Sequence, residues 1–355
     1  SREGKILLDE TMVQLDTFYD GEAGLLATAM GGVRRHNVRA SAHYALGLLI
    51  RGGAEDIPRA VKAVNAVIDT QYDCPGEIYH GTFRRVPQEP HPPKGTLPWR
   101  EISLQDRYFM DVACERITNT LNKRLACDAD LAPYAARVGE HLLQAVLAEY
   151  PVVWKSYDPN WREFIGCAFA LMLACFEDAL PAETVRRILA SAKIAMEGAI
   201  ERSRSGFTPL NTNIEIMHVF LADYFGNRLG DRAAVQYAAG YAEELSKRYA
   251  KYHSVCEYNS PTYYGVDLTA IGFWRKFAVT PRIRELGEII EAGLWEDVAD
   301  MYNHAMRNMC GPFSRNYEMD MSRHTSLHAL MFLGLGMDRF AERPFNVESD
   351  HNPLL

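Results

Sequence analysis

The chain has 355 residues, of which 48% are hydrophobic and 24% charged, a composition typical of a globular protein. No run approaches the roughly 20 consecutive apolar residues of a membrane-spanning helix, and a net charge of -8 without a basic stripe argues against nucleic-acid binding. Seven scattered cysteines without a CxxC pair favour a reducing compartment, so we expect a cytoplasmic protein. A secreted protein that has lost its signal peptide would begin in the same way.

Apolar periodicity predicts helices along the whole chain, and no strong alternating strand pattern competes with it. Several predicted helices begin with a capping signal, such as Asp56 before Ile57-Pro58. The predicted helices, in chain order, cover residues 5–19, 38–51, 57–72, 103–124, 130–149, 161–177, 182–202, 212–225, 231–249, 261–277, 282–307 and 322–334.

Alternate helices in this series differ in character. The odd-numbered ones, such as 182–202, carry a charged face, whereas the even-numbered ones are apolar nearly all round, as a buried helix is. We therefore expect one all-α domain over residues 1–355, an (α/α)6 toroid of six inner and six outer helices. The predicted inner helices are 38–51, 103–124, 161–177, 212–225, 261–277 and 322–334.

Polar side chains cluster at the starts of the predicted inner helices. Helix N-termini present unsatisfied N–H groups and a positive dipole end, which suit an anionic or oxygen-rich ligand. We expect these clusters to form one composite site. Its candidate residues are Asn37, Arg107, Asp158, Trp161, Asn211, Asn213, Glu257, Asn259, Tyr263, Tyr264, Arg315, Tyr317, Asp320 and His324.

The densest cluster is the segment 256–265, Cys-Glu-Tyr-Asn-Ser-Pro-Thr-Tyr-Tyr-Gly. In a catalytic interpretation, Tyr263 or Tyr264 supplies a proton-transfer hydroxyl, Asn259 orients a substrate oxygen, and Glu257 acts as a carboxylate acid or base. In a structural interpretation, Asn259-Ser-Pro caps the next helix and the tyrosines are core residues. Capping leaves Glu257 and the tyrosines unexplained, so we favour the catalytic role.

Two further clusters have both a binding and a structural interpretation. Of Asn211 and Asn213, one is needed as an N-cap, and the other is free to bind a substrate carboxylate. Near the C-terminus, Arg315 is a candidate carboxylate clamp and His324 a candidate base, with Tyr317 and Asp320 beside them. A salt-bridged loop explains that second cluster equally well.

The remaining candidates are expected to contact or support the substrate. Asp158 begins a turn before a helix, and Trp161 is either a sugar-stacking platform or a core residue. Asn37 and Arg107 complete the predicted ring. The sequence has no HxH, HExxH, CxxC, GxSxG or GxGxxG spacing, so we expect no metal and no cofactor.

On these features, the chain resembles the six-hairpin carbohydrate-active superfamily, and within it the alginate-lyase type of polysaccharide lyase. Those lyases have an asparagine at the start of one inner helix, the place of Asn211 or Asn213 here. About two helices later they have a tyrosine, the place of Tyr263 or Tyr264. They usually have histidine directly after the asparagine, whereas this chain has Thr212, so the base has to come from elsewhere, with His324 as the candidate.

The resemblance implies β-elimination at a uronic acid without a cofactor. Such a reaction needs neutralisation of the sugar carboxylate, abstraction of the C5 proton and protonation of the leaving oxygen. The asparagines and Arg315 would serve the first step, and a tyrosine with His324 the other two.

Three alternatives stay open. A glycoside hydrolase would use Glu257 as acid with Asp158 or Asp320 as base. A cofactor-free dehydratase or isomerase would act on a small apolar substrate, and a ligand-binding or scaffold protein would use no chemistry at all. We expect a glycan or small-molecule partner and neither nucleic acid nor membrane, with homo-oligomer formation left open.

Overall fold

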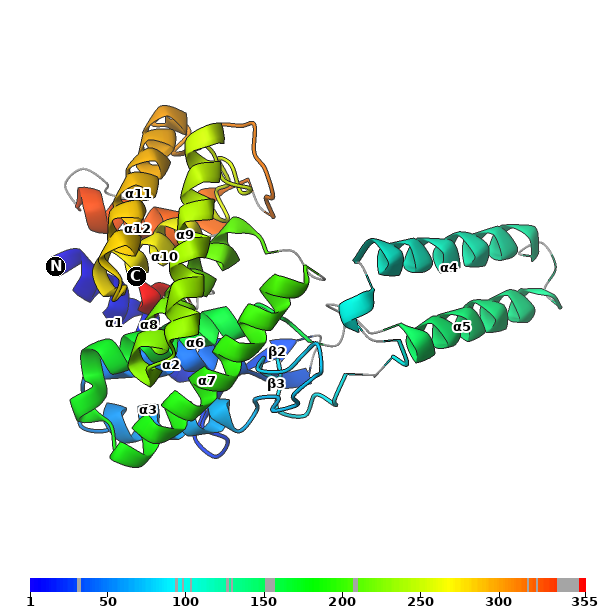
Figure 1. Cartoon of the computed structure of the whole chain (residues 1–355), viewed down its shortest axis with the longest axis horizontal. Helices are drawn as coiled ribbons and strands as arrows, with labels where there is room; N and C mark the ends of the chain where they lie inside the picture. Colours follow the sequence, from blue (N-terminus) through cyan, green and yellow to red (C-terminus); the bar gives the residue numbers. More distant parts are fainter. Residues whose placement is uncertain are drawn as a thin grey trace.

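The structure is a computed structural model, which describes residues 1–30, 33–92, 95–97, 99–102, 104–125, 128, 130–150, 157–206, 210–317, 319–323, 325–336 and 351–355. Its described part is dominated by α-helices, so the all-α prediction is confirmed (Figure 1). The helices are α1 (Arg2–Phe18), α2 (Val38–Arg51), α3 (Asp56–Ile68), α4 (Leu104–Leu125), α5 (Ala132–Glu149), α6 (Trp161–Phe176), α7 (Ala182–Ser205), α8 (Thr212–Leu229), α9 (Arg232–Tyr252), α10 (Tyr264–Phe277), α11 (Pro281–Met301) and α12 (Thr325–Leu335).

Two small antiparallel sheets interrupt the helices. The first joins β1 (Tyr19–Asp20), β2 (Leu25–Met30) and β3 (Val33–Asn37), and the second joins β4 (Tyr302–Asn303) and β5 (Asn308–Met309). These strands were not predicted from the sequence. Two glycines separate β2 from β3 in the sequence, a recognised hairpin signal, but strands this short give little alternation.

The inner helices contact one another in series, α2 with α6, α6 with α8, α8 with α10, and α10 with α12. Outer helices cover them: α3 packs on α2, α7 on α6 and α8, α9 on α8, and α11 on α10, while α1 contacts both α2 and α12 (Figure 1). Every residue from Trp161 to Leu173 of α6 is buried, as its apolar sequence predicts. A closed toroid of six hairpins stays a prediction.

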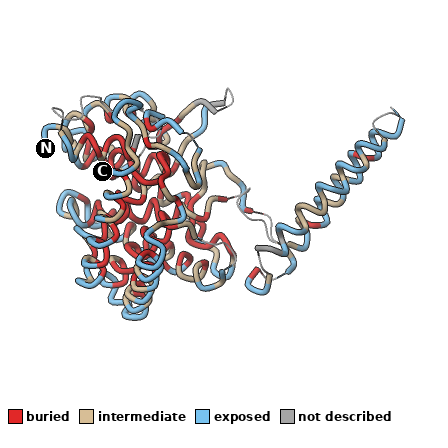
Figure 2. Tube along the Cα trace, turned by 90° about the horizontal axis from the view of Figure 1, so that it is seen from above, coloured by how far each residue is buried: buried red, intermediate tan, exposed pale blue. Residues whose placement is uncertain are grey.

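The position of the α4–α5 hairpin differs from the one expected from the sequence. Residues 103–124 were predicted to form a buried inner helix, yet Tyr108 and Phe109 of α4 are each 68% exposed. The hairpin projects away from the other helices in both views (Figures 1 and 2), and α2 packs directly against α6 instead. The small and apolar residues of α4 are typical of a buried helix. Its charged residues, however, are spread around the helix, which is typical of an exposed one. The single-domain prediction for residues 1–355 stays a prediction.

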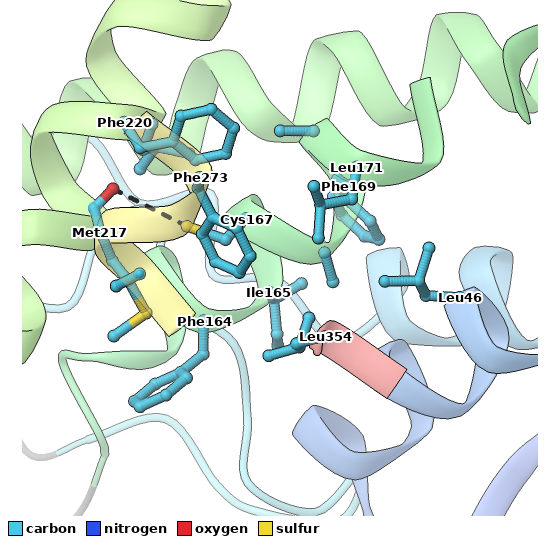
Figure 3. Packing of buried hydrophobic residues seen from close by; sticks show 14 of the residues in the cluster. Leu46, Phe164, Ile165, Cys167, Phe169, Leu171, Met217, Phe220, Phe273 and Leu354 are labelled. Atoms are coloured by element: carbon cyan, nitrogen blue, oxygen red, sulfur yellow. Dashed lines mark hydrogen bonds between the residues drawn. The ribbon is translucent and has the colours of Figure 1, made fainter. Parts of the chain in front are cut away.

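The core lies between the inner helices. The rings of Phe220 and Phe273 lie 5.4 Å apart, and the thiol of Cys167 is 3.7 Å from the carbonyl oxygen of Met217 (Figure 3). The backbones of α10 and α12 approach so closely that a Cβ on Gly265 would lie 2.1 Å from the backbone nitrogen of Leu327. This packing fixes the helix starts, and hence the polar groups there, relative to one another.

Candidate active site

Arg315 lies at the centre of the best-connected polar cluster. Its Nη1 donates to Glu257 Oε1 at 2.6 Å, and its Nη2 donates to the hydroxyl oxygen of Tyr263 at 3.2 Å. Glu257 is fully buried, whereas the Arg315 side chain is 34% exposed. The guanidinium therefore links a buried carboxylate to the surface.

Two segments remote in sequence are tied together to build this cluster. The hydroxyl of Thr262 donates to Asn316 Oδ1 at 2.8 Å, and the hydroxyl of Ser314 donates to the carbonyl of Cys256 at 2.6 Å. Arg315 itself has a φ of 51°, in the left-handed region that non-glycine residues rarely occupy. The surrounding bonds hold a conformation that costs about 1 kcal/mol or more, a feature common at functional sites.

Burial dominates the electrostatics of the cluster. Desolvation raises the pKa of Glu257, although the charge and hydrogen bond of Arg315 and the Thr212 hydroxyl oppose this. Asp267, in the first turn of α10, is fully buried, and burial together with the negative charge of Glu257 raises its pKa well above the ordinary 3.8. Within the described residues, neither carboxyl oxygen of Asp267 has a hydrogen-bond partner. Burial without a partner therefore favours the protonated form of Asp267.

Tyr263 and Tyr317 connect the cluster to solvent. Their ring centroids are 5.5 Å apart, and Tyr317 is 73% exposed while Tyr263 is nearly buried. Burial and the hydrogen bond to Tyr317 raise the pKa of the Tyr263 phenol. At neutral pH the phenol keeps its proton, so it is suited to donate one.

The structure does not bring Tyr264 and Asn259 into the cluster in the expected way. The Tyr264 hydroxyl donates to Asp297 Oδ2 of the outer helix α11 at 2.8 Å. The Asn259 side-chain nitrogen donates to the carbonyls of Cys310 and, at 2.9 Å, Pro312. Both side chains thereby hold chain segments in place.

The start of α8 contributes to the cluster through Thr212. The Thr212 hydroxyl accepts a hydrogen bond from the Cys256 amide at 3.0 Å and also contacts Glu257. Asn211 is the N-cap residue of α8 without a side-chain capping bond. Asn213 is buried, and its Oδ1 has no partner among the described residues. That free acceptor oxygen makes Asn213 the better of the two candidates.

A second polar group lies at the starts of α2 and α6. The guanidinium of Arg39 lies 5.8 Å from the ring centroid of Trp161. Asp158 accepts a hydrogen bond from the Asn160 amide at 2.9 Å, and burial raises the Asp158 pKa. Asn37 caps α2 by accepting from the Ala40 amide at 3.0 Å.

The other predicted residues are not brought into either group. Asp320 is exposed and accepts from the Ser322 amide at 2.8 Å, in the short 3₁₀ helix η3 (Met321–Arg323). His324 lies outside the described residues, as does the side chain of Arg107, whose backbone belongs to α4. The candidate residues thus fall into two polar groups, and a single ring of site residues stays a prediction.

Sequence reasoning missed three buried carboxylates, each in the first turn of an inner helix. Besides Asp267, they are Glu163 of α6 and Glu215 of α8. Glu163 Oε1 lies 3.6 Å from Nδ1 of His218, and Glu215 Oε1 accepts from Arg248 at 2.6 Å. The available signal was an acid in the first turn of a helix that is otherwise apolar.

The described residues contain neither a metal-ligand cluster nor a membrane-spanning helix. No three His, Cys, Asp or Glu side chains there gather in the manner of metal ligands. Among the described helices, none has the length and apolar character needed to cross a membrane.

The fold and the cluster define an all-helical protein with a buried charged centre at its helix starts. A family model matches residues 5–107 and 134–351, and its description is Domain of unknown function (DUF8769). The chain belongs to this family. Neither a curated protein nor a solved structure matches the chain.

Proposed function

We propose that this protein is an enzyme that cleaves a uronic-acid-containing glycan by β-elimination, with Tyr263 and Arg315 as the groups that face the substrate. One observation carries the proposal. The guanidinium of Arg315 contacts both Glu257 Oε1 and the Tyr263 hydroxyl, and it is the partly exposed member of this set.

The two groups match two needs of an elimination. A guanidinium binds a carboxylate through two parallel hydrogen bonds, so Arg315 is suited to neutralise the charge of a uronate and make its C5 proton acidic. Tyr263 keeps its proton at neutral pH and is suited to give it to the leaving glycosidic oxygen. Glu257 holds Arg315 in place, and His324 remains the proposed base.

Hydrolysis is less well supported by the same geometry. A hydrolase needs a carboxyl group that touches the glycosidic oxygen. Glu257 is fully buried with one oxygen on Arg315, and Asp158 and Asp320 each accept a backbone amide. A dehydratase or isomerase of a small apolar substrate has less support still, since the cluster is charged.

The location proposed from the sequence is the cytoplasm, on the scattered spacing of the seven cysteines. The substrate would then be an oligosaccharide or a polymer that reaches that compartment.

The test is to incubate the full chain with a panel of uronic-acid and neutral glycans and to follow two signals. Elimination produces an unsaturated sugar that absorbs in the ultraviolet together with new reducing ends. Reducing ends without the absorbance would replace elimination by hydrolysis. A response in neither channel across the panel would contradict a glycan-cleaving enzyme.

A further inference from the structure

The hairpin α4–α5 stands apart from the rest of the molecule (Figures 1 and 2). Its two helices pack against each other, and a Cβ on Gly139 of α5 would lie 2.9 Å from Thr118 of α4. Only Ala135 and Val146 of α5 are buried. Two helices alone cover one stripe of each other, and a stable unit normally needs a further layer.

The hairpin leaves an unusual amount of apolar surface uncovered. Among the described residues, eighteen large apolar side chains are exposed, and seven of them belong to the hairpin. Exposed large apolar side chains are thus more frequent on the hairpin than on the rest of the described chain, which favours an interaction surface there. The seven are Tyr108, Phe109, Ile117, Leu131, Tyr134, Val138 and Leu143.

The charges of α4 are divided between its two halves. Residues 104–115 contain three acids, Asp106, Asp111 and Glu115, and one cation, whereas residues 116–125 contain three cations and no acid. Two copies of α4 placed antiparallel and in full overlap bring the acidic half of each opposite the basic half of the other. Parallel copies would place like charges together. The charge pattern is therefore complementary to itself in the antiparallel arrangement.

The size of the surface also fits a second copy. Helices of 22 and 18 residues are about 33 and about 27 Å long and about 10 Å wide, which gives one hairpin face an area of about 600 Å². A standard interface buries about 800 Å² of accessible surface on each partner. Side chains make a helical face ridged, so its accessible surface is larger than its flat area.

The family match passes from residue 107 to residue 134. Residues 108–133, which form most of α4 and the turn after it, therefore lie outside the part that the family model matches, and so does the basic half of α4.

We propose that the hairpin is a homodimerisation element, in which α4 and α5 of one copy pack antiparallel on those of a second copy to form a four-helix bundle. The two copies use the same surface, as in most homodimers. Apolar side chains that share one side of the hairpin, such as Phe109 and Ile117 of α4, form the bundle interior, and the two halves of α4 set the direction of pairing.

The experiment is sedimentation velocity of the full chain over a concentration series, together with Ile117→Glu and the matched control Ile289→Glu. Ile117 is 45% exposed on α4 and Ile289 is 56% exposed on α11, so neither change disturbs a buried side chain. We expect the wild type and the control to sediment with twice the chain mass of 40.1 kDa. In Ile117→Glu the dimer dissociation constant should rise about tenfold or more, because a charge enters the interface.

A charge exchange tests the direction of pairing independently. Lys123→Glu should weaken the dimer, and the further change Asp106→Lys in the same chain should restore it, because full antiparallel overlap places residue 123 of one copy opposite residue 106 of the other. A monomeric wild type at all concentrations would overturn the proposal. A dimer lost in Ile289→Glu but retained in Ile117→Glu, or a charge exchange without rescue, would do so as well.

Discussion

Around Arg315, two buried carboxyls and one guanidinium share a site from which water is largely excluded. One charge of each sign, on Arg315 and Glu257, can be paired there, but a second negative charge on Asp267 would have no compensating cation. Protonation of Asp267 avoids this uncompensated buried charge. Protonation states in this cluster are thus set jointly by burial and by the single cation.

Replacing Tyr263 by phenylalanine should lower kcat by about 10²- to 10⁴-fold, since the leaving oxygen loses its proton donor. Tyr264→Phe is the matched control, because the Tyr264 hydroxyl bonds to Asp297 instead of Arg315. It should cost about 1 kcal/mol of stability and leave kcat nearly unchanged. Steady-state kinetics on an accepted glycan distinguish the two; equal losses in both variants would remove the assigned role of Tyr263.

Asp267 should make stability depend on pH in a defined direction. A carboxyl whose pKa is higher in the folded than in the unfolded state binds more protons when folded, so stability falls as pH rises above the unfolded value of 3.8. Asp267→Asn removes this loss, so as pH rises above about 4 the variant should lose less unfolding free energy than the wild type. Urea unfolding at several pH values measures this, and parallel curves for the two proteins would contradict it.

At the scale of elements, connections between helices depend on a few buried polar groups. Asp223 of α8 is fully buried, and its Oδ2 accepts from the amides of Val279 at 2.6 Å and Thr280 at 3.2 Å, just before α11. The carboxylate therefore joins the C-terminal part of α8 to the connection between α10 and α11. No sequence motif marks this role, since an aspartate six residues before a helix end looks like any surface acid.

Asp223→Ala should lower the free energy of unfolding by about 3 kcal/mol, because two buried amides lose their acceptor. Asp178→Ala, at an exposed position, serves as the control and should change it by about 0.5 kcal/mol or less. Chemical denaturation of both variants gives the comparison. A similar small effect at both positions would show that other groups satisfy the amides.

At the scale of the whole molecule, residues from both ends of the chain meet in one core. Asn352 donates to the Thr11 hydroxyl at 3.0 Å, and Leu354 is buried near Leu46 and Ile165 (Figure 3). The contacts join the first helix, the inner helices and residues 351–355. Such long-range contacts make the folded state cooperative.

Leu354→Ala should therefore lower the unfolding free energy by about 2–4 kcal/mol, through lost burial and a residual cavity. Leu229→Ala, at a position that is 36% exposed, should have a much smaller effect. Thermal unfolding of the two variants tests this, and equal melting temperatures would show that Leu354 contributes nothing to the core.

Local sequence determined the helices and most of their ends. The contrast between apolar and half-charged helices correctly assigned α6, α8 and α10 as buried, because complete burial leaves no room for a charged face. Local polar density also drew attention to Glu257, Tyr263 and Arg315, which the fold brings together.

Only the tertiary structure decided the remainder. Whether α4 is inner or projecting depends on which helix packs on α2, and the charges spread around residues 104–125 are the one sequence signal that it projects. The separation of Tyr263 from Tyr264, adjacent in sequence, follows from the direction in which α10 enters the core. The raised pKa of Asp267 likewise arises from burial beside Glu257, because desolvation and charge act through space and not along the chain.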